Sequence, residues 1–182
     1  SGTGYWSSLQ GAHKFTLGRH TTQIWSVAVH PKGWQVACGP NVPNAVSLYD
    51  PHTRRNTLNV PLDPNGRTVR AVAYSPDGLS LAAVDGATVK LIKFDDGYVY
   101  TTLKGHTSGV NAVAWSPDGK HLATAGGSVR WVRDEPRQDA GEVIVWRWER
   151  GGEAKVVHTL AAHAGGCFAL AWSPDGNAVA TG

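Results

Sequence analysis

The chain has 182 residues, of which 41% are hydrophobic and 17% are charged, and its net charge is +3 with a pI near 9.0. This length and composition are ordinary for one globular domain with a substantial buried core. No run approaches the roughly 18 consecutive apolar residues of a membrane span, and no segment has the basic and apolar regions of a signal peptide. Lysine and arginine residues are scattered and form no stripe, which argues against a nucleic-acid-binding surface.

Cys38 and Cys167 each lie within an apolar, strand-like run of the sequence. Cysteines in such positions are usually buried, and free thiols persist in reducing compartments. We therefore expect two buried free cysteines, with a disulfide as the alternative, and a cytoplasmic protein.

The first residues contain two short apolar patterns. Tyr5-Trp6 stands among glycines and serines, and the segment 13–17, "HKFTL", ends in an alternation of apolar and polar residues. Alternation with period two is typical of a half-buried strand. These residues are interpreted as strands whose place in the fold depends on the repeats that follow.

From residue 24 onward the chain repeats two apolar runs joined by a turn. The turn is Ser-Pro-Asp-Gly or a degraded copy of it, at 30–33, 75–78, 116–119 and 173–176. In such a turn proline presets φ, aspartate bonds back to the backbone and glycine accepts a positive φ. We therefore interpret Asp77, Asp118 and Asp175 as turn residues and not as acid–base groups.

Each repeat contains up to four predicted strands. The first strands are at 24–29, 69–74, 110–115 and 167–172, and the second strands at 34–39, 79–84, 121–126 and 177–182. The third strands are at 45–50, 88–94 and 142–148, and the fourth strands at 55–60, 98–103 and 155–160. Four short antiparallel strands in a repeat of about 40–45 residues are the pattern of one β-propeller blade.

The stretch "LKGHTSGVNAVAWSPDGKHLATAG" resembles the signature of the WD-repeat (WD40) β-propeller family. It contains Gly-His, an apolar strand, Ser-Pro-Asp-Gly and then Leu-Ala-Thr, and the resemblance extends over essentially the whole chain. His20, His106 and His163 each precede the next turn proline by 11 residues. The second repeat has Asn65 at this position and departs from the signature.

The resemblance implies a hydrogen-bonded network of histidine, serine or threonine, a turn aspartate and a third-strand tryptophan inside each blade. Carried over by position, the network residues are His20, His106, His163, Thr124, Thr181, Trp146, Trp6 and Asp85. The first repeat departs from the pattern with Cys38 and Tyr49, and the second with Ala83 and Ile92. Such a network rigidifies a sheet, so we expect a structural role for these residues and neither a catalytic nor a metal-binding one.

The strands add up to sixteen, or four blade equivalents, if the two ends of the chain share one blade. Trp6 precedes His20 by 14 residues, as Ile92 precedes His106, so Trp6 takes the third-strand position. The expected blades span approximately 20–60, 65–103, 106–160, and a split blade of 163–182 plus 3–17. The split blade closes either within one chain, as a four-bladed ring, or between two chains, as an eight-bladed homodimer. We favour the homodimer because WD-type blades fit wider rings; a fragment of a larger WD-repeat protein is a further alternative.

The sequence contains no catalytic motif and no cofactor-binding loop, so we expect a non-catalytic scaffold that binds a protein or peptide partner. Two sets of residues are candidates for partner binding. Six residues before each turn proline, near the mouth of the channel, stand Trp25, Arg70, Asn111 and Phe168. A long segment at 126–142 carries Arg130, Trp131 and Arg133. Aromatic residues and arginine are enriched at interface hot spots. The alternative is a self-assembling structural half-propeller, natural or engineered, that binds no ligand.

Overall fold

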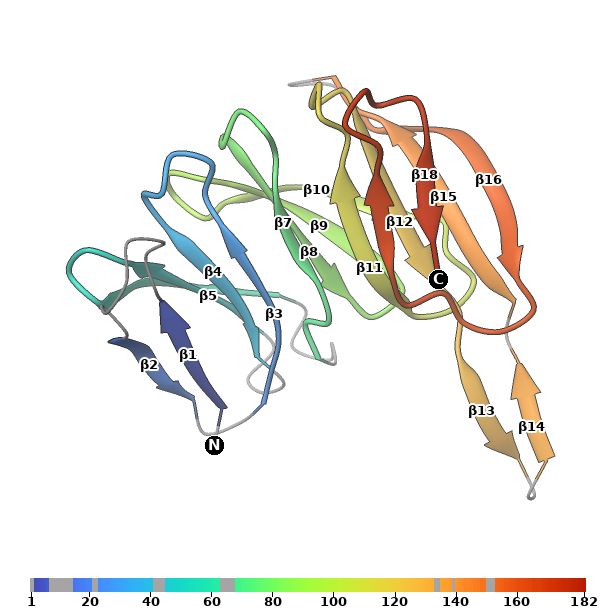
Figure 1. The fold of residues 1–182 in the computed structure, drawn as a ribbon, viewed down its shortest axis with the longest axis horizontal. Helices are drawn as coiled ribbons and strands as arrows, with labels where there is room; N and C mark the ends of the chain where they lie inside the picture. The colour runs from blue at the N-terminus through green and yellow to red at the C-terminus, as the bar shows by residue number, and fades with distance from the viewer. Residues whose placement is uncertain are drawn as a thin grey trace.

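The computed structural model describes the chain except for residues 1, 7–14, 21–22, 41–44, 63–67, 133–134, 139 and 150–152, and it describes only the backbone at 2–6, 15–20, 129–132 and 135–138. The fold is all-β, as the sequence predicts, and its sheets stand side by side along an open arc (Figure 1). Among the described residues no helix is long and apolar enough to cross a membrane.

Three four-stranded antiparallel sheets form the body of the arc. The first sheet contains β3 (Ile24–Val29), β4 (Val36–Pro40), β5 (Ala45–Asp50) and β6 (Arg55–Pro61). The second sheet contains β7 (Val72–Tyr74), β8 (Ser80–Asp85), β9 (Thr88–Lys93) and β10 (Val99–Lys104). The third sheet contains β11 (Val110–Trp115), β12 (His121–Gly126), β15 (Gly141–Arg147) and β16 (Lys155–His163). Within each sheet the strands are adjacent in chain order, which confirms the predicted strand–turn–strand repeats.

The turn chemistry explains why each hairpin forms where it does. Ser75 donates its hydroxyl proton to Asp77 Oδ1 over 2.6 Å, and the same oxygen accepts the N–H of Leu79 at 2.9 Å. Gly78 has φ of +75°, which a residue with a side chain rarely adopts. The serine hydroxyls and neighbouring N–H groups lower the pKa of the equivalent carboxylates, those of Asp118 and Asp175.

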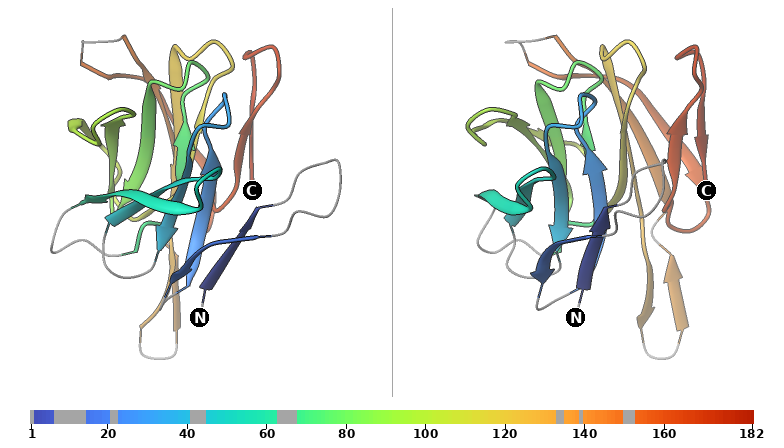
Figure 2. Two further views of the ribbon diagram at one scale, coloured as in Figure 1. Left: turned by 90° about the vertical axis from the view of Figure 1, so that its left-hand side faces the viewer. Right: turned by 60° about the vertical axis from the view of Figure 1, so that its left-hand side comes forward.

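The sheets are joined through their inner strands, β3, β7, β11 and β17 (Leu170–Trp172), which lie next to one another along the concave side of the arc (Figure 2). Trp115 donates its indole proton to Ala73 O at 3.1 Å, and Trp172 donates to Ala114 O at 3.0 Å. Apolar clusters fill the spaces between the first and second sheets and between the second and third sheets. We call each such space a junction.

Two short hairpins lie at the ends of the arc. The N-terminal hairpin, β1 (Gly2–Trp6) and β2 (Phe15–His20), lies beside the first sheet, whereas β17 and β18 (Val179–Thr181) form a fourth sheet beside the third. Among the described residues these two-stranded sheets do not pair with each other, and they occupy opposite ends of the arc (Figure 1). The four-bladed ring closed within one chain is therefore not formed here.

The long segment of the third sheet forms a hairpin of its own, which raises the number of strands above the sixteen expected. It consists of β13 (Val129–Val132) and β14 (Glu135–Gln138), and we call it the insertion hairpin. It projects from the side of the sheets on which the inner strands begin, at the bottom of Figure 1. Two first strands are shorter than predicted, β7 and β17, because the residues before them leave the regular ladder; Phe168, for example, bonds to Gly182 O.

Cys38 and Cys167 are both free and buried, as expected from their apolar surroundings. Cys38 lies on β4 beside Val36 and Tyr49, and burial raises the pKa of its thiol to about 11. A thiol with so high a pKa is hardly ever a thiolate, so Cys38 behaves as a small core residue.

Candidate functional site

The third sheet holds a buried hydrogen-bonded group formed by His106, Thr124 and Trp146. His106 Nε2 lies 2.7 Å from Thr124 Oγ1, and Trp146 donates its indole proton to the same oxygen at 2.9 Å. The threonine lies on β12 and the tryptophan opposite it on β15, while His106 precedes β11. The group therefore ties three segments of one sheet together through one hydroxyl.

Glu142 completes this group, and the sequence analysis missed it. Its Oε2 lies 2.9 Å from His106 Nδ1, although the carboxylate is off the direction of an Nδ1–H bond, so the contact is mainly electrostatic. Burial lowers the pKa of His106, and the carboxylate opposes that effect. Glu142 follows the insertion hairpin directly, at a position where the repeats elsewhere have no acid, so only an acid placed four residues before Trp146 could have signalled it.

The chemistry available to this group is limited by its burial. The side chain of His106 is only 2% exposed, and both of its ring nitrogens face protein groups. A general acid or base must reach a substrate proton, which this ring cannot do. Among the described residues no group of three or more histidine, cysteine, aspartate or glutamate side chains could hold a metal ion.

The other expected network residues are only partly brought together. His163 Nε2 lies 3.0 Å from Thr181 Oγ1 in the fourth sheet. Asp85 is buried at the end of β8, with Lys90 Nζ 4.0 Å from its carboxylate, in the sheet that has no histidine at this position. The side chains of Trp6 and His20 lie outside the described residues, so a contact of Trp6 with His163 remains a prediction.

The four residues expected near the channel mouth divide into two kinds. Arg70 donates to Asn111 Oδ1 at 2.7 Å, and Asn111 donates in turn to Gly127 O and Cys167 O. This pair therefore links the second, third and fourth sheets. Trp25 and Phe168, in contrast, are each 58% exposed and do not pack between the sheets.

The comparisons with known proteins agree with this geometry. Residues 97–130 and 154–182 match the family model described as WD domain, G-beta repeat. Two segments of the chain, one around the third sheet's first strands and one at the end of the chain, are therefore similar to WD repeats. The chain's first, second and third sheets have the order of WD blades, and the fourth has two strands of one. A search among curated proteins found no match.

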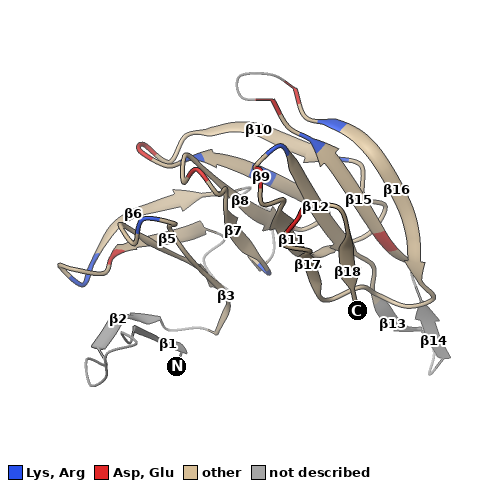
Figure 3. Cartoon of the chain, turned by 45° about the horizontal axis from the view of Figure 1, so that its top comes forward, with Lys and Arg blue, Asp and Glu red and all other residues tan. Residues whose placement is uncertain are grey.

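WD repeats generally mediate protein–protein interaction and are generally non-catalytic, which directs attention to the surfaces of this chain. Trp25 and Asn111 lie near the beginnings of the inner strands β3 and β11, and the insertion hairpin projects from the same side of the sheets. The side chains of Arg130 and Trp131 lie outside the described residues, as does the whole of Arg133. Charged residues elsewhere are spread over the turns and strand ends, with no continuous basic stripe among the described residues (Figure 3).

The open end of the arc exposes an apolar face. Val157 and Leu160 of β16 are 40% and 52% exposed, although both lie on a strand of a complete four-stranded sheet. A hollow of about 530 Å³ lies between this face and the fourth sheet, with Trp172 and Val179 among its walls. The third and fourth strands of a WD blade would cover this face, and the fourth sheet has only two strands.

Proposed function

We propose that this chain is a non-catalytic scaffold that binds a protein or peptide partner, and that two copies complete each other's open blade to form an eight-bladed ring. Three observations support assembly through the fourth sheet. They are the burial of one leucine position along the arc, the unpaired edge of β18, and the matching hairpin at the other end of the chain.

The leucine three residues before each signature histidine position reports whether the next blade is present. Leu62 and Leu103, in the first and second sheets, are 8% and 5% exposed because the outer strands of the following sheet cover them. Leu160 holds the same position in the third sheet and is 52% exposed. At roughly 25 cal/mol per Å² of apolar surface, covering this face gives a second copy a clear driving force.

The fourth sheet also presents a free strand edge. Among the described residues β18 pairs only with β17, which leaves the backbone groups on its other side available for a further strand. An unpaired edge next to an exposed apolar face favours addition of strands from another chain. The N-terminal hairpin is a two-stranded sheet of the required size, with Trp6 at the third-strand position, and the proposal assigns it to the partner copy.

The partner-binding surface is proposed at the mouth of the channel, around Trp25 and Phe168 and along the insertion hairpin with Arg130, Trp131 and Arg133. The exposure of the two aromatic rings supports this placement, since large exposed aromatics serve as interface anchors. The two free thiols support a reducing compartment such as the cytoplasm.

The mass of the particle in solution tests the assembly. Light scattering should give twice 19.3 kDa for the unmodified chain. Leu160→Lys should give the mass of one chain, 19.3 kDa, because a charge placed on the covered face disfavours the contact. Leu79→Lys is the matched control, since Leu79 is similarly exposed, at 46%, but lies in a turn of the second sheet away from this face. If the unmodified chain has the mass of one chain at all concentrations, the two-copy ring is refuted.

Partner binding is tested separately by capture with the immobilised chain. The double variant Trp131→Ala with Arg133→Ala should recover less of the partner protein. A substitution in the Ser-Pro-Asp-Gly turns, on the opposite side of the sheets, should leave the recovery unchanged. Equal recovery by both would remove the insertion hairpin from the proposal.

A further inference from the structure

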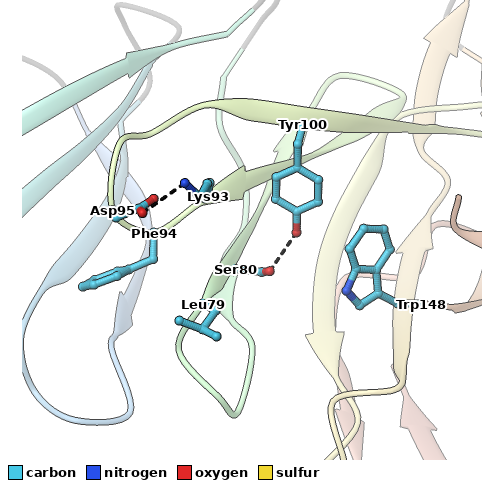
Figure 4. A pocket seen from close by; sticks show the side chains of 7 residues that line it. All are labelled: Leu79, Ser80, Lys93, Phe94, Asp95, Tyr100 and Trp148. Atoms are coloured by element: carbon cyan, nitrogen blue, oxygen red, sulfur yellow. Dashed lines mark hydrogen bonds and ion pairs between the residues drawn. The ribbon is translucent and has the colours of Figure 1, made fainter. Parts of the chain in front are cut away.

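A pocket of about 390 Å³ opens at the junction of the second and third sheets, on the side of the Ser-Pro-Asp-Gly turns (Figure 4). This side is opposite to the insertion hairpin. The walls come from turns and strands far apart in the chain: Leu79, Phe94, Tyr100 and Trp148. The lining is mostly apolar, which is the usual character of a site that takes an apolar group.

The pocket exists because small residues replace large ones at two repeat positions. At the junction of the first and second sheets, the residue before the turn proline is His30, whose ring lies 4.3 Å from that of Phe94. Trp34, four residues further on, stacks on His30 at 5.2 Å. The corresponding residues of the second sheet are Ser75 and Leu79. A serine and a leucine leave open the volume that a histidine and a tryptophan fill, and the pocket lies in that volume.

A polar group inside the pocket has no protein partner. Trp115, Trp146 and Trp172 each donate their indole protons to protein oxygens. Trp148 as a whole is nine-tenths buried, but its indole nitrogen is not among the fully buried polar atoms that lack a partner in the described part of the chain, so its N–H is accessible from the pocket. Its nitrogen is on the side of the ring that faces Ser80 and Leu79 (Figure 4). An accessible donor in a mostly apolar wall can fix the orientation of a bound acceptor.

The rim of the pocket carries a net negative charge at one end. Lys93 Nζ lies 3.0 Å from Asp95 and 3.4 Å from Asp96, so one ammonium group serves two carboxylates. The ion pair raises the pKa of Lys93 and lowers that of Asp95, so these two groups stay charged near neutral pH. A ligand group next to this rim is therefore favoured if it is a cation.

The pocket continues into a second hollow, so the whole site is elongated. The second hollow has a volume of about 410 Å³, shares Ser80 and Trp148 with the first, and has Lys120 and Arg147 in its walls. An elongated site with an apolar end and a donor in the middle fits a short extended polypeptide.

We propose that this pocket binds an extended segment of a partner protein, with a large apolar side chain in the pocket, a backbone carbonyl on Trp148 Nε1, and a basic residue beside Asp95 and Asp96. The inference rests on the proposed role of the chain in protein binding, but it is independent of the two-copy ring because none of the residues that line the 390 Å³ pocket lines the hollow at the open end.

The test uses a blocked tetrapeptide, acetyl-Ala-Phe-Lys-Ala-amide, and the indole N–H resonance of Trp148 in the ¹⁵N-labelled chain. Trp148→Phe assigns the resonance, and it should fold because Phe94 holds the same position in the second sheet. We expect a saturable shift of this resonance with the peptide. Replacing phenylalanine by alanine, or lysine by glutamate, should weaken binding by about tenfold, the loss expected for one anchoring group.

A filled-pocket variant gives the second arm of the test. Leu79→Trp reproduces Trp34 of the first sheet and should abolish the shift, whereas Asn177→Trp, at the same turn position of the fourth sheet, should bind as the unmodified chain does. The proposal is overturned if the peptide leaves the Trp148 resonance unmoved at millimolar concentration, or if the alanine peptide or Leu79→Trp binds equally well. If the chain is monomeric in light scattering but binds the peptide, the two-copy ring is rejected and the pocket proposal is kept.

Discussion

The junction between the second and third sheets and the junction between the third and fourth are built on the same repeat but are filled differently. Leu103 lies in a cluster with Trp146 and Trp148 at the first of these junctions. Leu160, at the same repeat position, faces a hollow at the other. The leucine is the same and its own sheet is complete in both cases, so the difference lies in the outer strands of the following sheet.

This difference shows that a propeller core is made between blades and not within them. A four-stranded sheet presents two faces, and each needs a neighbour to be buried. Substitutions at matched positions of two junctions, or of a junction and the interior of a sheet, should therefore differ in their effects.

The largest effect is expected for Leu103→Ala compared with Leu160→Ala. Loss of the buried leucine should lower the free energy of unfolding by about 3 kcal/mol, whereas the exposed one should cost less than about 1 kcal/mol in a single chain. Urea unfolding measures both free-energy losses, at a protein concentration where light scattering shows the chain to be monomeric. Equal losses under these conditions would show that Leu160 is covered within its own chain.

The turn glycines provide a second comparison. Gly78 and Gly176 have nearly the same positive φ, but a Cβ on Gly78 would lie 2.3 Å from the His30 ring, whereas the nearest contact at Gly176 is 3.6 Å. We expect Gly176→Ala to cost about 1 kcal/mol for the backbone alone and Gly78→Ala about 2 kcal/mol or more. Thermal unfolding of the two variants measures the difference, and equal melting temperatures would mean that His30 moves aside without cost.

Thr124→Val tests a contact within one sheet that no neighbouring sheet provides. The substitution keeps the shape but leaves the ring nitrogen of His106 and the indole proton of Trp146 without their shared oxygen. We expect a loss of about 1–2 kcal/mol, independent of protein concentration. If the loss of stability in Thr124→Val instead grows with protein concentration, the hydrogen-bonded group of His106, Thr124 and Trp146 would also depend on contacts at the open end.

The smallest effect is expected from pH, through His30. Two contacts hold the ring in place: Nδ1 accepts the N–H of Lys32 at 3.1 Å, which a protonated ring cannot do, and Nε2 lies 3.1 Å from Gly78 O. Burial lowers the pKa of His30, so below about pH 6.5 the unfolded chain binds a proton that the folded chain does not. Stability should therefore fall as the pH drops from 7.5 towards 5.5, and less steeply in His30→Ser, which matches Ser75. The same slope in both chains, measured by urea unfolding, would exclude His30 as its source.

The local features of the fold could be predicted from the sequence because they depend on neighbouring residues. The alternation of apolar residues and the Ser-Pro-Asp-Gly turns placed the hairpins to within a few residues. The resemblance to WD repeats, carried over by position, also implied that Thr124 and Trp146 are neighbours of His106.

Features that depend on contacts between repeats could not be predicted in this way. Glu142 lies at the start of β15, and its carboxylate comes to 2.9 Å from His106 Nδ1 across the sheet, where the other repeats have no acid. The pocket beside Trp148 arises from the small size of Ser75 and Leu79 relative to residues 45 positions earlier, and that matters only once two sheets are in contact. The division of the channel-mouth residues into a bonded pair and two exposed rings likewise depends on the neighbouring sheets.

The unpaired edge of β18 has a consequence for how copies of the chain associate. In the proposed assembly, the hairpin at one end of the arc and the strand edge at the other would make a head-to-tail contact, and such a contact ends only when the copies close into a ring. If the curvature of two arcs adds up to one turn, the assembly stops at two copies; if each arc is slightly too flat, the same contact continues into larger rings or a spiral filament. The stiffness of the inner-strand contacts, such as the indole bonds of Trp115 and Trp172, thus controls the size of the assembly as much as the affinity of its ends.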